Sequence, residues 1–392
     1  MKLSKQTGLL FILMAAAFTA CKKSPAQQPV VMVKDSIKFY KWTEFVMGAD
    51  LSFVNQVQDY GGVYRDSNLV RDPYTIFKNH GANVVRVRLW HNPQWLAPLN
   101  AGKLYSDIYD VEKTIKRAKA VGMAVNLDLH YSDTWADPAN QTTPAAWVGL
   151  SLSVLKDSVY NYTLTVLNYL KSKNCTPEMI QIGNETNQGM LWPLGKVINN
   201  DFTAFSSLLN SGIKAVRDFS VTTSFKPQII LHVAQLQNAT YWTNGIIAGG
   251  VTDFDILGLS HYSQWSTINT MTDIKNTIST LKSTFNKKIM IVETAYPFTT
   301  DNADNYANIN SANAVITGYA TTAAGQYQYM KDLTQAVISG GGTGIMYWEP
   351  AWISSAYHDL WGIGSSWENN AFFDFKGNTL KGIDYMNYAY QF

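Results

Sequence analysis

Short apolar runs alternate with longer amphipathic stretches along most of this chain. The runs are rich in Val, Ile and Leu and predict β-strands; they lie at residues 45–51, 83–90, 123–130, 178–185, 228–233, 254–261, 288–293 and 344–348. The stretches between them repeat apolar residues at close to the helical period. They predict helices at residues 107–121, 152–170, 202–219, 272–285 and 326–338. Ser106 or Asp107 is the expected cap of the first helix, and Gly122 ends it.

Strand followed by helix, repeated eight times, predicts an α/β protein with a parallel sheet. We expect this sheet to close into a (β/α)8 TIM barrel, as a single domain over residues 41–392, because that length fits one barrel with insertions. An open, doubly wound sheet is the alternative. It is disfavoured because no glycine-rich phosphate-binding loop follows the first strand-like run.

Polar and aromatic residues gather where these strands are expected to end, which is where barrel enzymes carry their active sites. A single Arg or His at such a place is often only a structural partner, so the accumulation is what indicates a site. The residues concerned are Arg86, Arg88, Trp90, His91, Asp128, His130, Tyr131, Asp133, Trp135, Asn184, Glu185, His261, Tyr262, Trp265, Glu293, Trp348 and Glu349.

Glu185 and Glu293 are the most informative of these residues. They are the last residues of the fourth and seventh predicted strands, which lie on opposite sides of an eight-stranded barrel. Two carboxyl groups across a sugar can hydrolyse a glycosidic bond, since one donates a proton and the other stabilises or traps the cation. A separation of ~5–5.5 Å predicts retention of configuration and a wider gap predicts inversion. The sequence leaves that distance open.

Neighbouring residues can assist this pair. The amide of Asn184 can hydrogen-bond a sugar hydroxyl, and Trp348 offers an apolar surface to the C–H face of a sugar. We expect His261 or Tyr262 to hydrogen-bond the carboxylate of Glu293, and Arg88 to keep that carboxylate ionised.

The composition fits a neutral ligand that is bound by ring faces. Aromatic residues make up 13% of the chain, with 12 Trp and 22 Tyr, while charged residues are only 15%. The net charge of +2 gives no electrostatic reason to expect nucleic acid as a partner. The 2 cysteines are Cys21, near the amino terminus, and Cys175. With Cys21 in a targeting segment, neither an intramolecular disulfide nor a paired-cysteine metal site is expected.

The amino terminus has the pattern of an export signal. Lys2 and Lys5 precede an apolar stretch that is too short to span a membrane comfortably. Residues 18–21 resemble the lipobox of bacterial lipoproteins, so residues 1–20 are a predicted lipoprotein signal peptide and Cys21 a predicted lipidation site. Residues 21–40 then form a flexible tether. We expect a monomer that is exported, lipid-anchored to the outer membrane of a Gram-negative bacterium, and exposed at the cell surface. An ordinary signal peptide is the alternative.

Several motifs together resemble glycoside hydrolase family 53, within clan A. They are GADLS at residues 48–52, YGGVY at 60–64, VRVRLW at 85–90, DLHYSDTWADP at 128–138, QIGNET at 181–186, LSHY at 259–262 and GSSWEN at 364–369. The resemblance covers about residues 42–392. The segment at 128–138 is long and specific, whereas the Asn–Glu pair alone marks only the clan.

This resemblance implies an endo-β-1,4-galactanase, which cuts the galactan and type I arabinogalactan side chains of pectin with retention. It implies Glu185 as acid/base and Glu293 as nucleophile, with no cofactor for catalysis. It also implies a set of substrate-binding residues, with Trp90 and Trp135 lining neighbouring positions: Arg88, Trp90, Asp128, His130, Trp135, Asn184, His261, Tyr262 and Trp348.

The resemblance also implies a possible structural calcium ion, because bacterial members of this family often carry one that joins the loops after the seventh and eighth strands. The loop after the seventh strand here contains Asp301 and Asp304, and oxygen-rich side chains suit Ca²⁺. Ala303 interrupts the alternation expected of the ligands, so a solvated polar loop is the alternative.

Three other functions remain open. Another clan A endo-glycanase, such as a mannanase or glucanase, would keep the catalytic pair and differ only in its sugar subsites. A glycan-binding lipoprotein without activity is disfavoured because both glutamates and Asn184 are present. A metal-dependent hydrolase is disfavoured because no His-x-His follows the first strand.

Overall fold

The computed structural model describes residues 44–392, which belong to one compact unit. The predicted signal peptide (residues 1–20), the lipidation site Cys21 and the predicted tether (residues 21–40) lie outside the described residues. Among residues 44–392, each helix is too short or too polar to be a membrane span.

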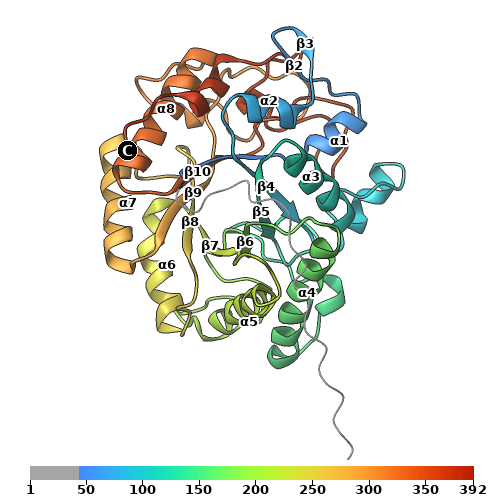
Figure 1. Cartoon of the computed structure of the whole chain (residues 1–392), viewed down its shortest axis with the longest axis vertical. Helices are drawn as coiled ribbons and strands as arrows, with labels where there is room; N and C mark the ends of the chain where they lie inside the picture. Colours follow the sequence, from blue (N-terminus) through green and yellow to red (C-terminus); the bar gives the residue numbers. More distant parts are fainter. Residues whose placement is uncertain (1–43) are drawn as a thin grey trace, which may run out of the picture. The chain divides into compact units, whose positions relative to one another are not determined.

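Eight parallel strands close into a barrel (Figure 1). In the order in which they pair, they are β1 (Val46–Asp50), β10 (Gly344–Tyr347), β9 (Lys288–Thr294), β8 (Ile256–His261), β7 (Gln228–Ala234), β6 (Met179–Ile182), β5 (Ala124–Leu129) and β4 (Val84–Leu89). Pairing of β1 with β4, for example Ala49 with Val85, closes the ring. Each strand overlaps one of the eight predicted runs, so the TIM barrel predicted from the sequence is confirmed.

Helices surround the barrel (Figure 1). They are α1 (Val54–Asp59), α2 (Pro73–Asn79), α3 (Ile108–Ala120), α4 (Leu152–Ser172), α5 (Thr203–Ser220), α6 (Leu236–Ala248), α7 (Met271–Phe285) and α8 (Ala323–Ser339). The five predicted helices are present, and α3 begins at its expected cap, Asp107, whose side chain accepts from two backbone N–H groups. The sequence analysis missed α1 and α2, which are short, and α6, whose Gly and β-branched residues weaken the helical signal.

Shorter elements occupy the loops. A small antiparallel hairpin pairs β2 (Arg65–Asp66) with β3 (Leu69–Val70). Five 3₁₀ helices lie among residues 44–392: η1 (Gln94–Leu99), η2 (Ala145–Trp147), η3 (Ala312–Ala314), η4 (Glu368–Asn370) and η5 (Lys381–Asn387).

The interior of the barrel has an apolar base below a polar layer. The base is a closed cluster of buried side chains: Val46, Val84, Ala124, Met179, Ile230, Ile256, Met290, Val292 and Met346. Alternate residues of a strand face the same side. The next inward positions along β4, β6 and β7 are therefore Arg86, Gln181 and His232, all of them buried. The side chains of the site rest on this base.

A bulge in β9 turns one key residue toward the barrel interior. Leu259 of β8 pairs with Ile291 and the next residue, Ser260, pairs with Glu293, so Val292 is an extra residue in β9. Without this bulge, strict alternation from Met290 would point the side chain of Glu293 at the helices. The bulge re-aims it inward, which is a recurrent use of bulges beside active sites.

Candidate active site

Glu185 lies just beyond β6, in a backbone conformation that side chains rarely adopt. Its φ angle is 45°, in the left-handed region. Its backbone N–H donates to Nδ1 of His232 (3.2 Å), and its Oε1 accepts from Oγ of Ser260 (2.5 Å). Burial, together with the negative charge of Glu293, raises the pKa of Glu185 well above the usual carboxyl range. Glu185 is therefore suited to hold a proton at neutral pH.

The contacts of Glu293, unlike those of Glu185, include a cation. Its Oε1 lies 2.8 Å from Nη2 of Arg86, and its Oε2 accepts from the hydroxyl of Tyr262 (2.9 Å). Burial raises the pKa of Glu293 to about 7, while the charge of Arg86 and the Tyr262 hydrogen bond oppose that rise. Of the two carboxyl groups, Glu293 is the one that contacts a cation, so Glu293 is better placed to be ionised and Glu185 to hold a proton.

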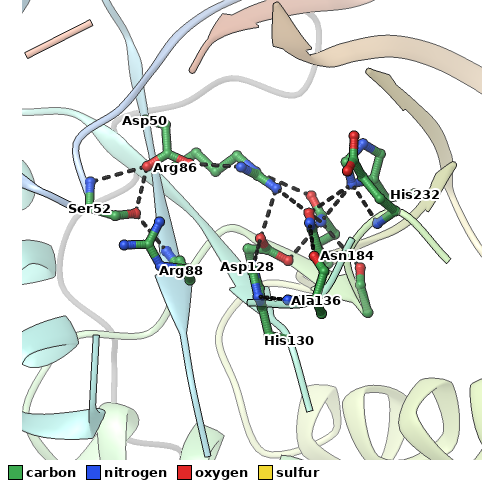
Figure 2. A network of polar contacts seen from close by, with 12 residues as sticks. Asp50, Ser52, Arg86, Arg88, Asp128, His130, Ala136, Asn184 and His232 are labelled. Carbon is green, nitrogen blue, oxygen red and sulfur yellow. Dashed lines mark hydrogen bonds and ion pairs between the residues drawn. The ribbon is translucent and has the colours of Figure 1, made fainter. Parts of the chain in front are cut away.

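Arg86 connects three carboxylates beneath the rim. Its Nη1 contacts Asp50 (2.7 Å), and its Nη2 contacts Asp128 (2.7 Å), as Figure 2 shows. The nitrogen Nη2 lies 2.8 Å from Oε1 of Glu293. Nη2 also donates to Oδ1 of Asn184 (2.8 Å), which places the residue before Glu185 in the same network. The side chain of Arg86 is only 1% exposed. The fixed fork of a guanidinium suits such a multi-carboxylate position.

The prediction that Arg88 keeps Glu293 ionised is wrong, because Arg86 occupies that place. Nη1 of Arg88 instead lies 3.3 Å from Glu349. Its guanidinium is packed between three rings, 4.8 Å from Phe53, 4.6 Å from Trp90 and 4.2 Å from Trp135. Arg88 points into the barrel as Arg86 does, but it packs against these three aromatic rings and does not contact Glu293.

Asp128, His130 and Asn184 have most of their polar atoms engaged by the protein. Both oxygens of Asp128 accept hydrogen bonds, from Gln181 and Arg86, and Nε2 of His130 lies 3.0 Å from Oδ2. Nδ1 of His130 accepts from the backbone N–H of Ala136, and Asn184 donates to the carbonyl of Ala136. Asp128 is fully buried, so it supports the rim from below.

The structure separates the two neighbours His261 and Tyr262. Tyr262 hydrogen-bonds Glu293, as expected. The expectation that His261 belongs to the site is wrong. His261 is fully buried, and its Nε2 lies 3.4 Å from the hydroxyl of Tyr329 on α8. The ring therefore faces the helix layer and not the mouth of the barrel. The reason is local, because Ser260 faces inward and the next residue along a strand points the other way.

Aromatic rings form a series across the rim. Its members are in ring contact one after another, with centroids 4.7–6.1 Å apart, in the order Trp361, Trp95, Trp90, Trp135, Trp348, Trp367, Tyr262 and Trp265. The predicted residues Trp90, Trp135 and Trp348 are in its middle. Its ends are the most exposed, Trp361 at 58% and Trp265 at 50%. Exposed ring faces can bind the apolar faces of sugars. Trp90 and Trp367 are only 1% and 2% exposed, so they support neighbouring rings from beneath and do not offer a face to a sugar.

The sequence analysis missed His232 and Ser260 as site residues. His232 lies inside β7 and Ser260 inside β8, so neither is the polar residue that ends its strand. The alternation of side chains along a strand could have found them. His232 and Ser260 each lie two residues after a residue that faces the barrel interior, Ile230 on β7 and Gly258 on β8.

Asp301 and Asp304, the predicted calcium ligands, lie in different surroundings. Asp301 is exposed, and Oδ2 of Asp304 already accepts from the hydroxyl of Ser354 and from the backbone N–H of Ser365 (2.9 Å). No group of three or more His, Cys, Asp or Glu side chains that could hold a metal occurs within residues 44–392. Asp304 joins the loops after β9 and β10 by hydrogen bonds of its own.

A parallel eight-stranded barrel with two unequal carboxyl groups and a row of aromatic rings at its rim defines a glycoside hydrolase of the barrel type. Comparison with known proteins gives the particular family. The profile of Glycosyl hydrolase family 53 matches residues 46–386, so the chain belongs to this family.

Individual relatives agree. The chain is 42% identical to an arabinogalactan endo-beta-1,4-galactanase of Cellvibrio japonicus over 89% of this chain and 92% of the relative. The solved catalytic domain of family 53 from Ignisphaera aggregans superposes with a TM-score of 0.80 at 35% identity, covering 93% of this chain and all (100%) of that one. A solved fungal beta-1,4-galactanase gives 0.73 at 31% identity over 87% and 98%.

More distant structures share the fold alone. An exo-beta-1,4-mannosidase from an Opitutaceae bacterium has a TM-score of 0.55 at 14% identity, covering 87% of this chain and 58% of that one.

Proposed function

We propose that this protein is a retaining endo-β-1,4-galactanase acting on β-1,4-galactan and on the type I arabinogalactan side chains of pectin. The relatives that cover most of both chains are galactanases by name. The observation that carries the mechanism is the unequal setting of the two glutamates. Glu293 is paired with a cation and a phenol, whereas Glu185 has no cation in contact and its pKa is raised by desolvation and by the charge of Glu293.

The reaction proceeds in two displacements. In the first, a carboxylate oxygen of Glu293 attacks the anomeric carbon and forms a glycosyl–enzyme ester, while the proton of Glu185 passes to the departing sugar oxygen. In the second, Glu185 takes a proton from water, whose oxygen attacks the same carbon and releases Glu293. Arg86 and Tyr262 hold Glu293 in place and favour its ionised form, as a nucleophile requires.

The substrate lies along the series of aromatic rings. Asn184 directly precedes Glu185, and Tyr262 hydrogen-bonds Glu293. These two residues and Trp348 of the ring series are proposed to contact the sugar that is cleaved. Trp135, which Trp90 supports, lines the adjacent part of the rim. The exposed rings at both ends, Trp361 and Trp265, suit further units of a polymer, and this favours cleavage within a chain. The protein needs no cofactor for these steps.

Digestion of a panel of polysaccharides tests the proposal directly. Potato galactan, mannan, xylan and cellulose are each incubated with the wild type and with Glu293→Ala, and the products are sized. Short galacto-oligosaccharides from galactan alone, absent with the variant, support endo-galactanase action. Cleavage of mannan or cellulose in place of galactan would identify another clan A endo-glycanase. NMR of the first-formed anomer distinguishes retention from inversion.

We also propose that the protein is exported and anchored by a lipid at Cys21 to the outer membrane, facing outward. The support is the lipobox-like sequence and the size of the polymer, which cannot enter a cell intact. Labelling with a fatty-acid analogue in cells should mark the wild type but not Cys21→Ser. Labelling of both, or of neither, contradicts this anchor.

A structural Ca²⁺ in the loop after β9 also remains a prediction, and no catalytic step depends on it. Two buried oxygens in this region, Oε2 of Glu368 and Oδ1 of Asn308, have no hydrogen-bond partner. An increase in Tm on adding Ca²⁺ to chelator-treated protein supports the prediction, and an unchanged Tm contradicts it.

A further inference from the structure

Three successive strands of the barrel are joined by a closed loop of hydrogen bonds around Glu185. The backbone N–H of Glu185, beyond β6, meets Nδ1 of His232 on β7 at 3.2 Å. Nε2 of His232 lies 2.9 Å from Oγ of Ser260 on β8. Oγ of Ser260 returns to Oε1 of Glu185 at 2.5 Å. The loop therefore begins and ends on the same residue, at its backbone and at its carboxyl group.

The direction of each hydrogen bond is fixed by the first one. A backbone N–H can only donate, so Nδ1 of His232 must be unprotonated. The side-chain amide nitrogen of Gln181, also a donor, lies 3.1 Å from the same nitrogen. Oδ1 of Asn184 is 3.0 Å from Nδ1 as well, but it has two other donors, Arg86 and Gln181, for its two lone pairs. The single ring proton is thus on Nε2, and it is donated to Ser260.

His232 stays neutral in this setting. It is fully buried, and burial together with the charge of Arg86 lowers its pKa well below the usual value. Asp128 opposes that decrease, and His130 adds to it. A neutral ring with its proton on Nε2 fixes the role of Ser260: the hydroxyl accepts from His232, so its own proton is directed at Oε1 of Glu185.

We propose that His232 and Ser260 are positioning residues that reserve Oε1 of Glu185 as a hydrogen-bond acceptor, so that the catalytic proton is carried by Oε2. The inference rests on the proposed acid/base role of Glu185. In the first displacement, the proton leaves Oε2 for the departing sugar oxygen. In the second, the same Ser260 hydrogen bond stabilises the carboxylate that takes a proton from water on Oε2.

Ser260 also lies next to the nucleophile, because it is the residue paired with Glu293 across the β9 bulge. One hydroxyl thus links the position of the acid to the strand that carries Glu293. If the Ser260–Glu185 hydrogen bond were only structural, its removal would affect stability and would lower activity on all substrates alike. If it directs the proton, its removal changes the pH dependence of activity and lowers activity most on substrates with poor leaving groups.

The test uses full-length Ser260→Ala. The alkaline limb of the kcat/KM profile reports the acid in the free enzyme. Loss of a hydrogen bond to the ionised form of Glu185 should move this limb to higher pH by about one unit. Activity on galactan should decrease about tenfold or more, and activity on an aryl galactobioside with an activated leaving group much less, because such a group needs little protonation.

Two further variants serve as controls. Ser260→Thr keeps the hydroxyl and should restore the position of the limb. Ser263→Ala removes another buried hydroxyl near the end of β8, one that donates to the carbonyl of Ala314, and should leave the limb unchanged. If Ser260→Ala does not fold, Ser260→Cys retains the volume with only a weak donor and gives the same expected displacement.

An unmoved limb with equal losses on both substrates would overturn the inference. A separate measurement keeps it distinct from the proposed function. If Glu185→Ala loses activity equally on galactan and on the activated substrate, the acid role itself fails. If Glu185→Ala shows the leaving-group difference but Ser260→Ala leaves the limb in place, only the role of Ser260 and His232 is refuted.

Discussion

Replacement of Arg86 by lysine tests the electrostatic basis of the site. The variant keeps the positive charge and loses the fork. In the wild type Nη1 and Nη2 reach Asp50 on one side and Asp128 and Glu293 on the other, all at 2.7–2.8 Å. A single ammonium nitrogen on a shorter stem cannot keep both sides. We therefore expect the contact to Glu293 to weaken or disappear.

The size of the effect follows from that one contact. A hydrogen bond to a charged group contributes about 1.5–3 kcal/mol, which corresponds to a ~10–150-fold decrease in kcat/KM. Because the charge of Arg86 favours the ionised form of Glu293, weakening this contact should also raise the pKa of Glu293. The acidic limb of the kcat/KM profile should then move to higher pH.

The assay is the pH dependence of kcat/KM on galactan, with Arg217→Lys as matched control. Arg217 also contacts two carboxylates, Asp253 and Asp255, but away from the active site, close to the start of β7. Its variant should keep wild-type kcat/KM. An Arg86→Lys enzyme with a normal acidic limb and less than about a threefold loss would refute the assignment of Arg86 as the cation that maintains Glu293.

Three further outcomes follow from the same structure. Glu293→Ala should lose more than about a thousandfold in kcat on galactan, because the covalent step is removed; near-full activity would contradict the nucleophile assignment. The pKa of Glu293 in the folded protein, about 7, exceeds its value in the unfolded chain, ~4.3. Its contribution to stability is therefore largest below the lower value and falls as pH rises between the two, by at most ~1.4 kcal/mol per pH unit. Chemical denaturation of Glu293→Gln should lack this part of the wild-type slope, and identical slopes would contradict it. Trp361→Ala and Trp265→Ala should raise KM for galactan and leave cleavage of a short activated glycoside nearly unchanged, which steady-state kinetics on both substrates can check.

Much of the fold and of the catalytic pair could be predicted from local pattern. The eight strands were found because buried parallel strands appear as continuous apolar runs. Glu185 and Glu293 were found because each is the polar residue that ends such a run. The same reasoning found Trp348 and Tyr262, and it failed at His261, whose direction depends on which way Ser260 points.

The choice between Arg86 and Arg88 as the partner of Glu293 shows why some contacts of the site could not be predicted from the sequence. Both residues face inward on β4, so alternation alone cannot distinguish them. Their heights relative to Glu293 depend on how β4 is staggered around the barrel against β9, with β1 and β10 between them. That stagger is a property of the closed sheet, and no segment of sequence contains it.

The sequence by itself determined the barrel, the two glutamates and the aromatic character of the rim, because period, strand length and strand end are local properties. The tertiary structure decided which side chains meet. The bulge at Val292 turned Glu293 inward, the stagger gave it Arg86, and the pairing of β6, β7 and β8 brought His232 and Ser260 to Glu185. These contacts join residues far apart in the chain, so they depend on register and on closure of the sheet.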